Sequence, residues 1–315
     1  MNAVDSKDLH VVFGTGPLGL AVARALARRG RRIRVVNRKG AAPAADPAAE
    51  IVPADAYDAE SVRSVTRGAA VVYQCAQPGY TQWPQKFPAL QSAIVEGVGA
   101  NGARLIVAEN LYMYGDVPGP LREDLPCAAA TRKGRTRAEM ADALLEAHRA
   151  GKVRVAMARG SDFFGPWALG SALGERIFGP ALKGKSASAA GNLDLPHTYT
   201  FIDDFGEAMA VLGEREESLG QAWHVPNAPT LTTRQVITMI FHEAGGPPKM
   251  SGMGRLGFRL AGLFIPEARE MVEMAYEFEK PFVVDSGKYA SAFGDHFTPL
   301  PEALRRTVTW YRSRS

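Results

Sequence analysis

The sequence predicts an α/β fold with a doubly wound parallel sheet and a smaller C-terminal lobe. In the first half of the chain, short apolar runs alternate with segments whose apolar residues recur at helical spacing. This order is typical of parallel strands connected by covering helices. Beyond Gly165 the alternation gives way to segments rich in Gly, Pro and Ser, such as LKGKSASAAGNLDLPHT. The second half is therefore expected to form a separate lobe.

The elements can be assigned in order along the chain. The first strand is the apolar run 11–13, and the helix after its glycine turn starts at Pro17, a residue suited to a first helical turn. Runs rich in Val, Ile and Ala predict further strands at 33–36, 51–52, 69–73, 104–108 and 153–158. Helical periodicity predicts helices at 59–67, 85–101, 134–150, 204–212, 233–244 and 266–279.

Composition excludes several classes of protein. The chain has 315 residues, 46% of them hydrophobic, and a net charge of +4, a composition typical of a globular protein. The sequence contains no nucleic-acid recognition motif, which argues against a nucleic-acid-binding protein. Its two cysteines, Cys75 and Cys127, form no C-x-x-C pair and no metal-ligand spacing, so we expect a reducing, cytoplasmic location and no metal. No apolar run approaches the length of a membrane span.

The glycine turn after the first strand predicts a dinucleotide site. Gly14, Gly16 and Gly19 form G-x-G-x-x-G between strand and helix, with Pro17 and Leu18 in the same turn. In a Rossmann-type unit these glycines allow a tight turn, approach of the pyrophosphate and close helix packing. We therefore assign 1–165 to a dinucleotide-binding domain, with returning segments near 196–226, and 166–315 mainly to a substrate-binding lobe.

The end of the second strand favours NADP(H) over NAD(H). NAD sites usually carry an acidic residue here that binds the ribose hydroxyls, whereas this chain has Asn37, Arg38 and Lys39. A guanidinium can bind a ribose 2′-phosphate through charge-assisted hydrogen bonds. Solvated loop charges are the alternative. Asp55 is expected either to accept from the adenine amino group or to cap a helix, and Ala76 is expected to line the cofactor site.

The chain resembles the extended short-chain dehydrogenases/reductases, which include nucleotide-sugar epimerases and dehydratases. The resemblance rests on VVFGTGPLG, DAYDAESVRSVTRGAAVVYQCAQP, LIVAENLYMYGD with REDLP, RGSDFFGP and HTYTFIDDFGEAM. The family carries a Ser before a Tyr-Gly pair and a Tyr-x-x-x-Lys motif on the following helix. Here Asn110 stands at the serine, Lys133 at the tyrosine and Arg137 at the lysine, while Tyr114 keeps the Tyr-Gly position.

The resemblance implies roles for the replacing residues. Arg137 would bind the nicotinamide ribose, and Asn110 would polarise a carbonyl oxygen. Lys133 lies one helical turn from Arg137, and this like charge together with burial would favour a neutral amine able to exchange a proton. The alternatives are that both cations are exposed, that they bind the cofactor without chemistry, or that Lys133 forms a Schiff base.

Aromatic residues and one histidine are candidate substrate contacts. Tyr80 and Trp83 follow the fourth strand, where ligands bind in this architecture. Tyr112 is an alternative acid, and Tyr112 and Tyr114 would face opposite sides if extended. Phe164 and His197 lie in segments that resemble the family's cleft. A structural role is the alternative for each.

These observations predict an NADP(H)-dependent oxidoreductase that acts on a carbonyl or related group of a small organic molecule. An NADP-dependent epimerase or dehydratase is the first alternative. A catalytically inactive NADP-binding sensor or regulator is the second, because the family's Ser, Tyr and Lys are replaced. The helices at 133–148 and 268–279 could form a homodimer contact.

Overall fold

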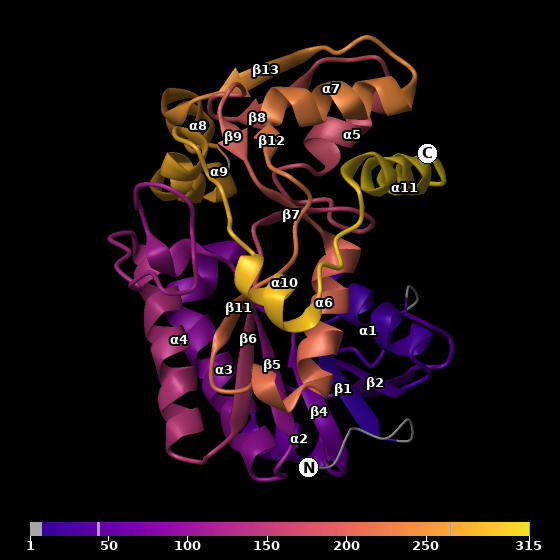
Figure 1. Ribbon diagram of the computed structural model, residues 1–315, viewed down its shortest axis with the longest axis vertical. Helices are drawn as coiled ribbons and strands as arrows, with labels where there is room; N and C mark the ends of the chain where they lie inside the picture. Colours follow the sequence, from indigo (N-terminus) through magenta and orange to yellow (C-terminus); the bar gives the residue numbers. More distant parts are fainter. Residues whose placement is uncertain (1–7, 43–44, 265, 315) are drawn as a thin grey trace.

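The computed structural model describes residues 8–42, 45–264 and 266–314. Its centre is a seven-stranded sheet in the order β11-β6-β5-β4-β1-β2-β3 (Figure 1). Each neighbouring pair of these strands is parallel. The strands are β1 (Leu9–Phe13), β2 (Arg32–Asn37), β3 (Glu50–Pro53), β4 (Ala69–Gln74), β5 (Arg104–Glu109), β6 (Arg154–Arg159) and β11 (Ala222–His224). The order steps outwards from β1 in both directions, which defines a doubly wound sheet.

Helices cover both faces of this sheet. One apolar core joins the sheet to α1 (Pro17–Arg28), α6 (Ile202–Glu214) and α10 (Gly287–Phe293). The other core joins it to α2 (Ala59–Val65), α3 (Trp83–Gly99) and α4 (Arg132–Arg149). The central strands β1, β4, β5 and β6 are buried on both faces, which explains why they are short continuous apolar runs rather than alternating ones.

The remaining elements form the lobe at the top of Figure 1. Its apolar core is built mainly from α5 (Glu175–Leu182), α7 (Thr233–Ala244) and α11 (Leu300–Arg312). Three two-stranded sheets complete it: β7 (Asp162–Phe164) with β10 (Tyr199–Phe201), β8 (Ala187–Ala190) with β13 (Met250–Met253), and β9 (Pro196–His197) with β12 (Leu231–Thr232). The other lobe elements are α8 (Arg255–Ala261), α9 (Pro266–Met271) and η4 (Val272–Phe278).

The predicted fold class is confirmed, and the strand order of the first half follows the predicted sequence of elements. One predicted helix is wrong. The range 266–279 forms the short helix α9 followed by the 3₁₀ segment η4. Over one or two turns, α and 3₁₀ helices both repeat close to every third residue, so periodicity does not distinguish them. No helix in the described part of the chain is long and apolar enough to cross a membrane.

Two glycines allow the tight turn that links β1 to α1. Gly14 has φ 107°, which favours glycine. A Cβ at Gly19 would lie 2.0 Å from the carbonyl oxygen of Gly14, so this helix can pack against the turn only if residue 19 has no side chain. Gly16 is different, because a Cβ there would meet no protein atom within 4 Å.

We predict that Gly19→Ala lowers the free energy of unfolding by roughly 2 kcal/mol or more, because the added methyl group must push the turn away from the helix. Gly16→Ala is the matched control and should leave stability nearly unchanged. Denaturant unfolding of the two variants measures both effects. Equal stability of the two variants would contradict the packing described for Gly19.

Candidate active site

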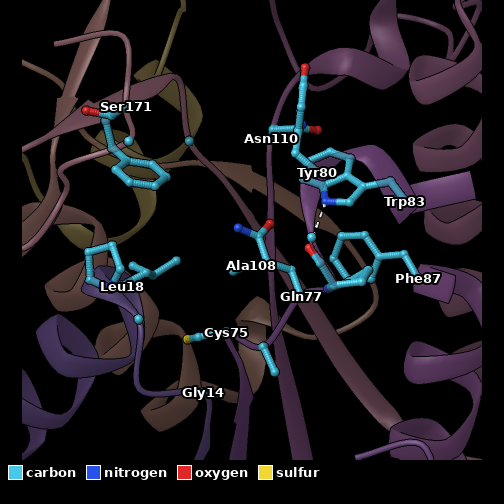
Figure 2. A pocket seen from close by; sticks show the side chains of 18 of the residues that line it. Gly14, Leu18, Cys75, Gln77, Tyr80, Trp83, Phe87, Ala108, Asn110 and Ser171 are labelled. Atoms are coloured by element: carbon cyan, nitrogen blue, oxygen red, sulfur yellow. Dashed lines mark hydrogen bonds between the residues drawn. The ribbon is translucent and has the colours of Figure 1, made fainter. Parts of the chain in front are cut away.

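A cavity of about 1000 Å³ lies between the carboxyl ends of the sheet strands and the lobe. Figure 2 shows Gly14, Leu18 and Cys75 on one side of it and Tyr80, Trp83 and Phe87 on the other. The glycine turn lines the first end. Residues of α9, η4 and β13 line the second end together with aromatic side chains from the loops after β4 and β5. The arrangement gives one continuous site with two chemically different ends.

The first end fits a dinucleotide. Gly14, Gly16, Pro17 and Leu18 line the cavity, and α1 begins at Pro17 without a side-chain cap. Gly16 has φ −73° and open space where a Cβ would stand, so nothing in the protein requires glycine there. A ligand that approaches the backbone closely would account for glycine at this position, and an uncapped helix end is favourable for a phosphate group.

The end of β2 presents one cation to this part of the cavity. The Asn37 side chain organises the following loop, since Nδ2 donates to the Ala41 carbonyl at 2.9 Å and Oδ1 accepts from the Gly40 amide at 2.8 Å. Arg38 lines the cavity, and no described carboxylate lies within ion-pair distance of its guanidinium. Lys39 is exposed and lies outside the cavity wall, so its contact with a phosphate stays a prediction.

Asp55 and Ala76 both line the cavity. The helix-cap alternative for Asp55 is wrong, because the side chain that caps α2 belongs to Asp58 and accepts from the Glu60 amide. Asp55 Oδ1 instead accepts from the Tyr57 amide at 3.0 Å. Ala76 lies against the turn, since a Cβ on Gly14 would be 2.9 Å from its amide nitrogen.

Asn110 lines the cavity and is labelled in the upper part of Figure 2. Its Oδ1 accepts from the Tyr112 amide at 3.3 Å, which fixes the orientation of the amide group. No described residue bonds to its Nδ2, so this nitrogen can donate to a ligand oxygen.

Arg137 is buried, with 1% of its surface exposed, and it also lines the cavity. Its guanidinium carbon lies 4.8 Å from the ring centre of Phe87 and 5.9 Å from that of Trp83. Nη2 donates to Glu109 Oε1 over a long 3.3 Å, and Nε has no hydrogen-bond partner. Burial lowers the pKa of this guanidinium and Glu109 opposes the shift. Arg137 therefore retains donor capacity at the cavity wall.

Glu109 is shared between two arginines. Its other oxygen accepts from Arg159 Nε at 2.9 Å, and Arg159 Nη1 donates to the Tyr114 hydroxyl at 2.7 Å. That hydroxyl lies 2.8 Å from His224 Nε2. Tyr114 is fully buried and outside the cavity wall. Its assignment as a catalytic residue is corrected, because its hydroxyl group is committed to this internal network.

Lys133 also lies outside the cavity wall. Its side chain is fully buried, and its ammonium group forms ion pairs with Glu270 and with Glu273, the latter at 2.8 Å. It also lies 4.6 Å from the ring centre of Tyr80. The hypothesis that Lys133 donates a proton to substrate therefore loses its geometric basis. Its observed role is to hold α9 and η4 against α4.

The aromatic residues at the second end form one wall. Tyr80, Trp83 and Tyr112 line the cavity, and Trp83 packs against both tyrosines. The hydroxyl oxygens of Tyr80 and Tyr112 lie 3.4 Å apart. Burial raises the pKa of both phenols above the usual value, so each is a neutral hydrogen-bond donor and a poor acid at neutral pH.

Phe164 and His197 do not reach the cavity, which corrects two expected substrate contacts. Phe164 is buried in the lobe core against Phe201. His197 is 3% exposed, stacks on Phe278 and approaches Asp162 Oδ2 to 2.9 Å through Nε2. Asp162 itself lines the cavity, so His197 acts on the site by orienting this carboxylate.

The sequence profile of the NAD dependent epimerase/dehydratase family matches residues 11–225. The chain belongs to this family. Its fold is similar to solved structures over nearly the whole length. The structure of gox2253 has a TM-score of 0.80 at 18% identity and covers 98% of this chain and 99% of its own. A search of curated protein sequences found no match.

Two further structures with the same fold were solved with NAD. DesIV, a dTDP-glucose 4,6-dehydratase from Streptomyces venezuelae, has a TM-score of 0.77 at 18% identity, with 96% of both chains covered. The UDP-glucuronic acid 4-epimerase from Bacillus cereus has a TM-score of 0.76 at 14% identity, with 97% of both chains covered. At these identities the similarity shows the fold and does not assign a substrate.

Sequence reasoning missed several cavity residues of this epimerase/dehydratase family member. Glu277 and Asp162 line the second end, and Gln74 lines the first end with both amide atoms unpartnered. Gln74 could have been found as a polar residue at the end of an apolar strand. Asp162 and Glu277 carry no motif, and only the packing of the lobe on the sheet brings them together. Among the described residues, no cluster of His, Cys, Asp or Glu could hold a metal ion.

We predict that Lys133→Met lowers the free energy of unfolding by roughly 2 kcal/mol, because two half-shielded carboxylates lose their counter-ion. Hydrogen exchange of residues 266–278 should accelerate in the same variant. Lys185→Met, at an exposed position, serves as the control. Unchanged stability and exchange would contradict the role assigned to the Lys133 ion pairs.

The neutral state of His224 predicts a pH dependence of stability. Burial lowers the pKa of this imidazole to about 4, whereas the unfolded chain binds the same proton near pH 6.5. Acid therefore favours the unfolded state, and His224 should cost about 2 kcal/mol of stability between pH 7 and pH 5. In His224→Gln the free energy of unfolding should fall less between pH 7 and pH 5 than in the parent. His242→Gln, at an exposed position, should show the same fall as the parent. Identical slopes for both variants would contradict the assignment.

Proposed function

We propose that the protein is an oxidoreductase that uses a nicotinamide dinucleotide, preferably NADP(H), to act on a carbonyl or hydroxyl group of a small organic molecule. The observation that carries the proposal is Gly16, whose missing side chain leaves open space beside an uncapped helix end in the cavity wall. Membership of the epimerase/dehydratase family supports the same cofactor class.

The preference for NADP(H) rests on the end of β2. A ribose 2′-phosphate would form an ion pair with Arg38. This residue lines the cavity and has no ion-pair partner among the described side chains. Asn37 occupies the place of a ribose-binding carboxylate, and its side chain forms hydrogen bonds with the backbone of the following loop. A carboxylate there would repel a phosphate, whereas the amide does not.

The chain's own residues would bind the reacting end as follows. Arg137, with its unpartnered Nε, would donate to the hydroxyls of the nicotinamide ribose. Asn110 would donate from Nδ2 to the substrate oxygen and polarise its C=O bond. The aromatic wall would exclude water from the reacting groups. The bound dinucleotide would supply the hydride donor or acceptor.

We predict that Arg38→Gln weakens NADPH binding by about tenfold and leaves NADH binding unchanged, because one charge-assisted phosphate contact is lost. Isothermal titration of both cofactors measures this difference. Arg63→Gln, which removes an exposed arginine paired with Glu60, is the control. Equal affinity of the parent for NADPH and NADH would refute the NADP preference.

Product analysis with NADPH separates the reaction types. Net loss of reduced-nicotinamide absorbance with a carbonyl substrate supports reduction. Altered substrate with unchanged cofactor would indicate epimerase or dehydratase chemistry instead. Cofactor binding without turnover across a broad carbonyl panel would indicate a sensor, and the proposed activity would be wrong.

A further inference from the structure

Glu277 is a buried carboxyl group at the second end of the cavity. It belongs to η4, lines the cavity and exposes 1% of its surface. Its Oε1 is buried and has no hydrogen-bond partner among the described residues. An ionised carboxylate that is buried without a partner is costly, so this geometry favours the protonated form.

The charges around Glu277 favour the same form. Asp162, which also lines the cavity, is a carboxylate whose charge acts on Glu277, and its Oδ2 lies 2.9 Å from His197 Nε2. Lys280 is the nearby cation, but its ammonium group bonds to Asp116 and, at 2.8 Å, to the Val117 carbonyl. Burial raises the pKa of Glu277 well above the usual value, the Asp162 charge adds to this shift, and Lys280 opposes it.

The other titratable groups near Glu277 are poor proton donors. The Glu277 charge acts on Tyr80 and Tyr112, which follow β4 and β5 and line the same cavity, and Tyr276 precedes it on η4. Burial raises the pKa of all three phenols. Lys133 is held by carboxylates outside the cavity. Glu277 is the remaining group that combines a transferable proton, a place in the cavity lining and an oxygen without a hydrogen-bond partner among the described residues.

We propose that Glu277 donates a hydrogen bond, and then its proton, to the reacting oxygen of the substrate. The inference rests on the proposed function and supplies the acid that the family's tyrosine would provide. The carbonyl carbon accepts a hydride from the reduced nicotinamide dinucleotide, the C=O π bond breaks, and the oxygen takes the Glu277 proton. The products are an alcohol, the oxidised dinucleotide and a Glu277 carboxylate, which recovers its proton from water.

The same wall defines the class of substrate. Tyr80, Tyr112, Phe278, Phe282 and Met253 give the second end a largely apolar surface. Asp162 also lies on this wall, and its carboxylate would repel an anionic group near the reacting oxygen. The substrate is therefore an uncharged, partly apolar carbonyl compound rather than a keto acid. A cationic amine held by ionised Glu277 is the rival outcome that the test must separate.

The first experiment detects whether the Glu277 carboxyl group is protonated and needs no substrate. Infrared difference spectra at pH 7 compare the parent with Glu277→Gln and with the control Glu279→Gln, which alters an exposed glutamate paired with Arg255. We expect Glu277→Gln alone to remove the C=O stretch of a protonated carboxyl group. Loss of carboxylate intensity instead would overturn the proposal and support an amine site.

The second experiment uses NADPH and an uncharged carbonyl compound that the parent reduces. Glu277→Gln should keep KM within about threefold, because the amide still donates a hydrogen bond, and should lower kcat by about 100-fold or more. Glu279→Gln should behave as the parent. A kcat within a few-fold of the parent in Glu277→Gln would overturn the acid role. If no carbonyl is turned over although NADPH binds, the proposed function fails and the acid step with it, while the infrared band still decides the protonation state.

Discussion

Helix α4 carries two buried cations, Lys133 and Arg137, and each is neutralised by carboxylates from a different part of the fold. The position of the site residues depends on these separate ion pairs. Lys133 pairs with Glu270 and Glu273 of the lobe, whereas Arg137 pairs with Glu109 at the end of β5. Because a buried charge without a partner is strongly unfavourable, each pair fixes the segment that supplies its carboxylate. Two like charges one turn apart are tolerated because they have separate partners.

The first consequence is the shape of the cavity. The Lys133 ion pairs hold α9 and η4 over the sheet, and η4 brings Glu277 to the cavity wall. The Glu109 network, which also contains Arg159, keeps Arg137 in the cavity lining, where its Nε has no hydrogen-bond partner. Lys133 and Arg137 lie one turn apart on α4. The first positions the segment that carries the candidate acid Glu277, and the second is itself the candidate ribose contact.

The sequence was sufficient for the sheet and the glycine turn, because these depend on local patterns: apolar runs and a G-x-G-x-x-G motif. It was insufficient for Lys133 and Tyr114. Their positions matched a family motif, but the direction of each side chain is set by partners remote in sequence, such as Glu270 for Lys133 and His224 for Tyr114. Glu277 could not be found at all, because burial without a partner is a property of the packed lobe.

A crystal structure of the protein with bound NADPH tests the account most directly. We expect the 2′-phosphate beside Arg38 and the nicotinamide ribose within hydrogen-bond distance of the Arg137 guanidinium. The free face of the nicotinamide ring should be turned towards Asn110 and Glu277. Lys133 should remain on its carboxylates. A nicotinamide ring placed away from Arg137, or a Lys133 ammonium that leaves Glu270 and Glu273 to contact the cofactor, would contradict it.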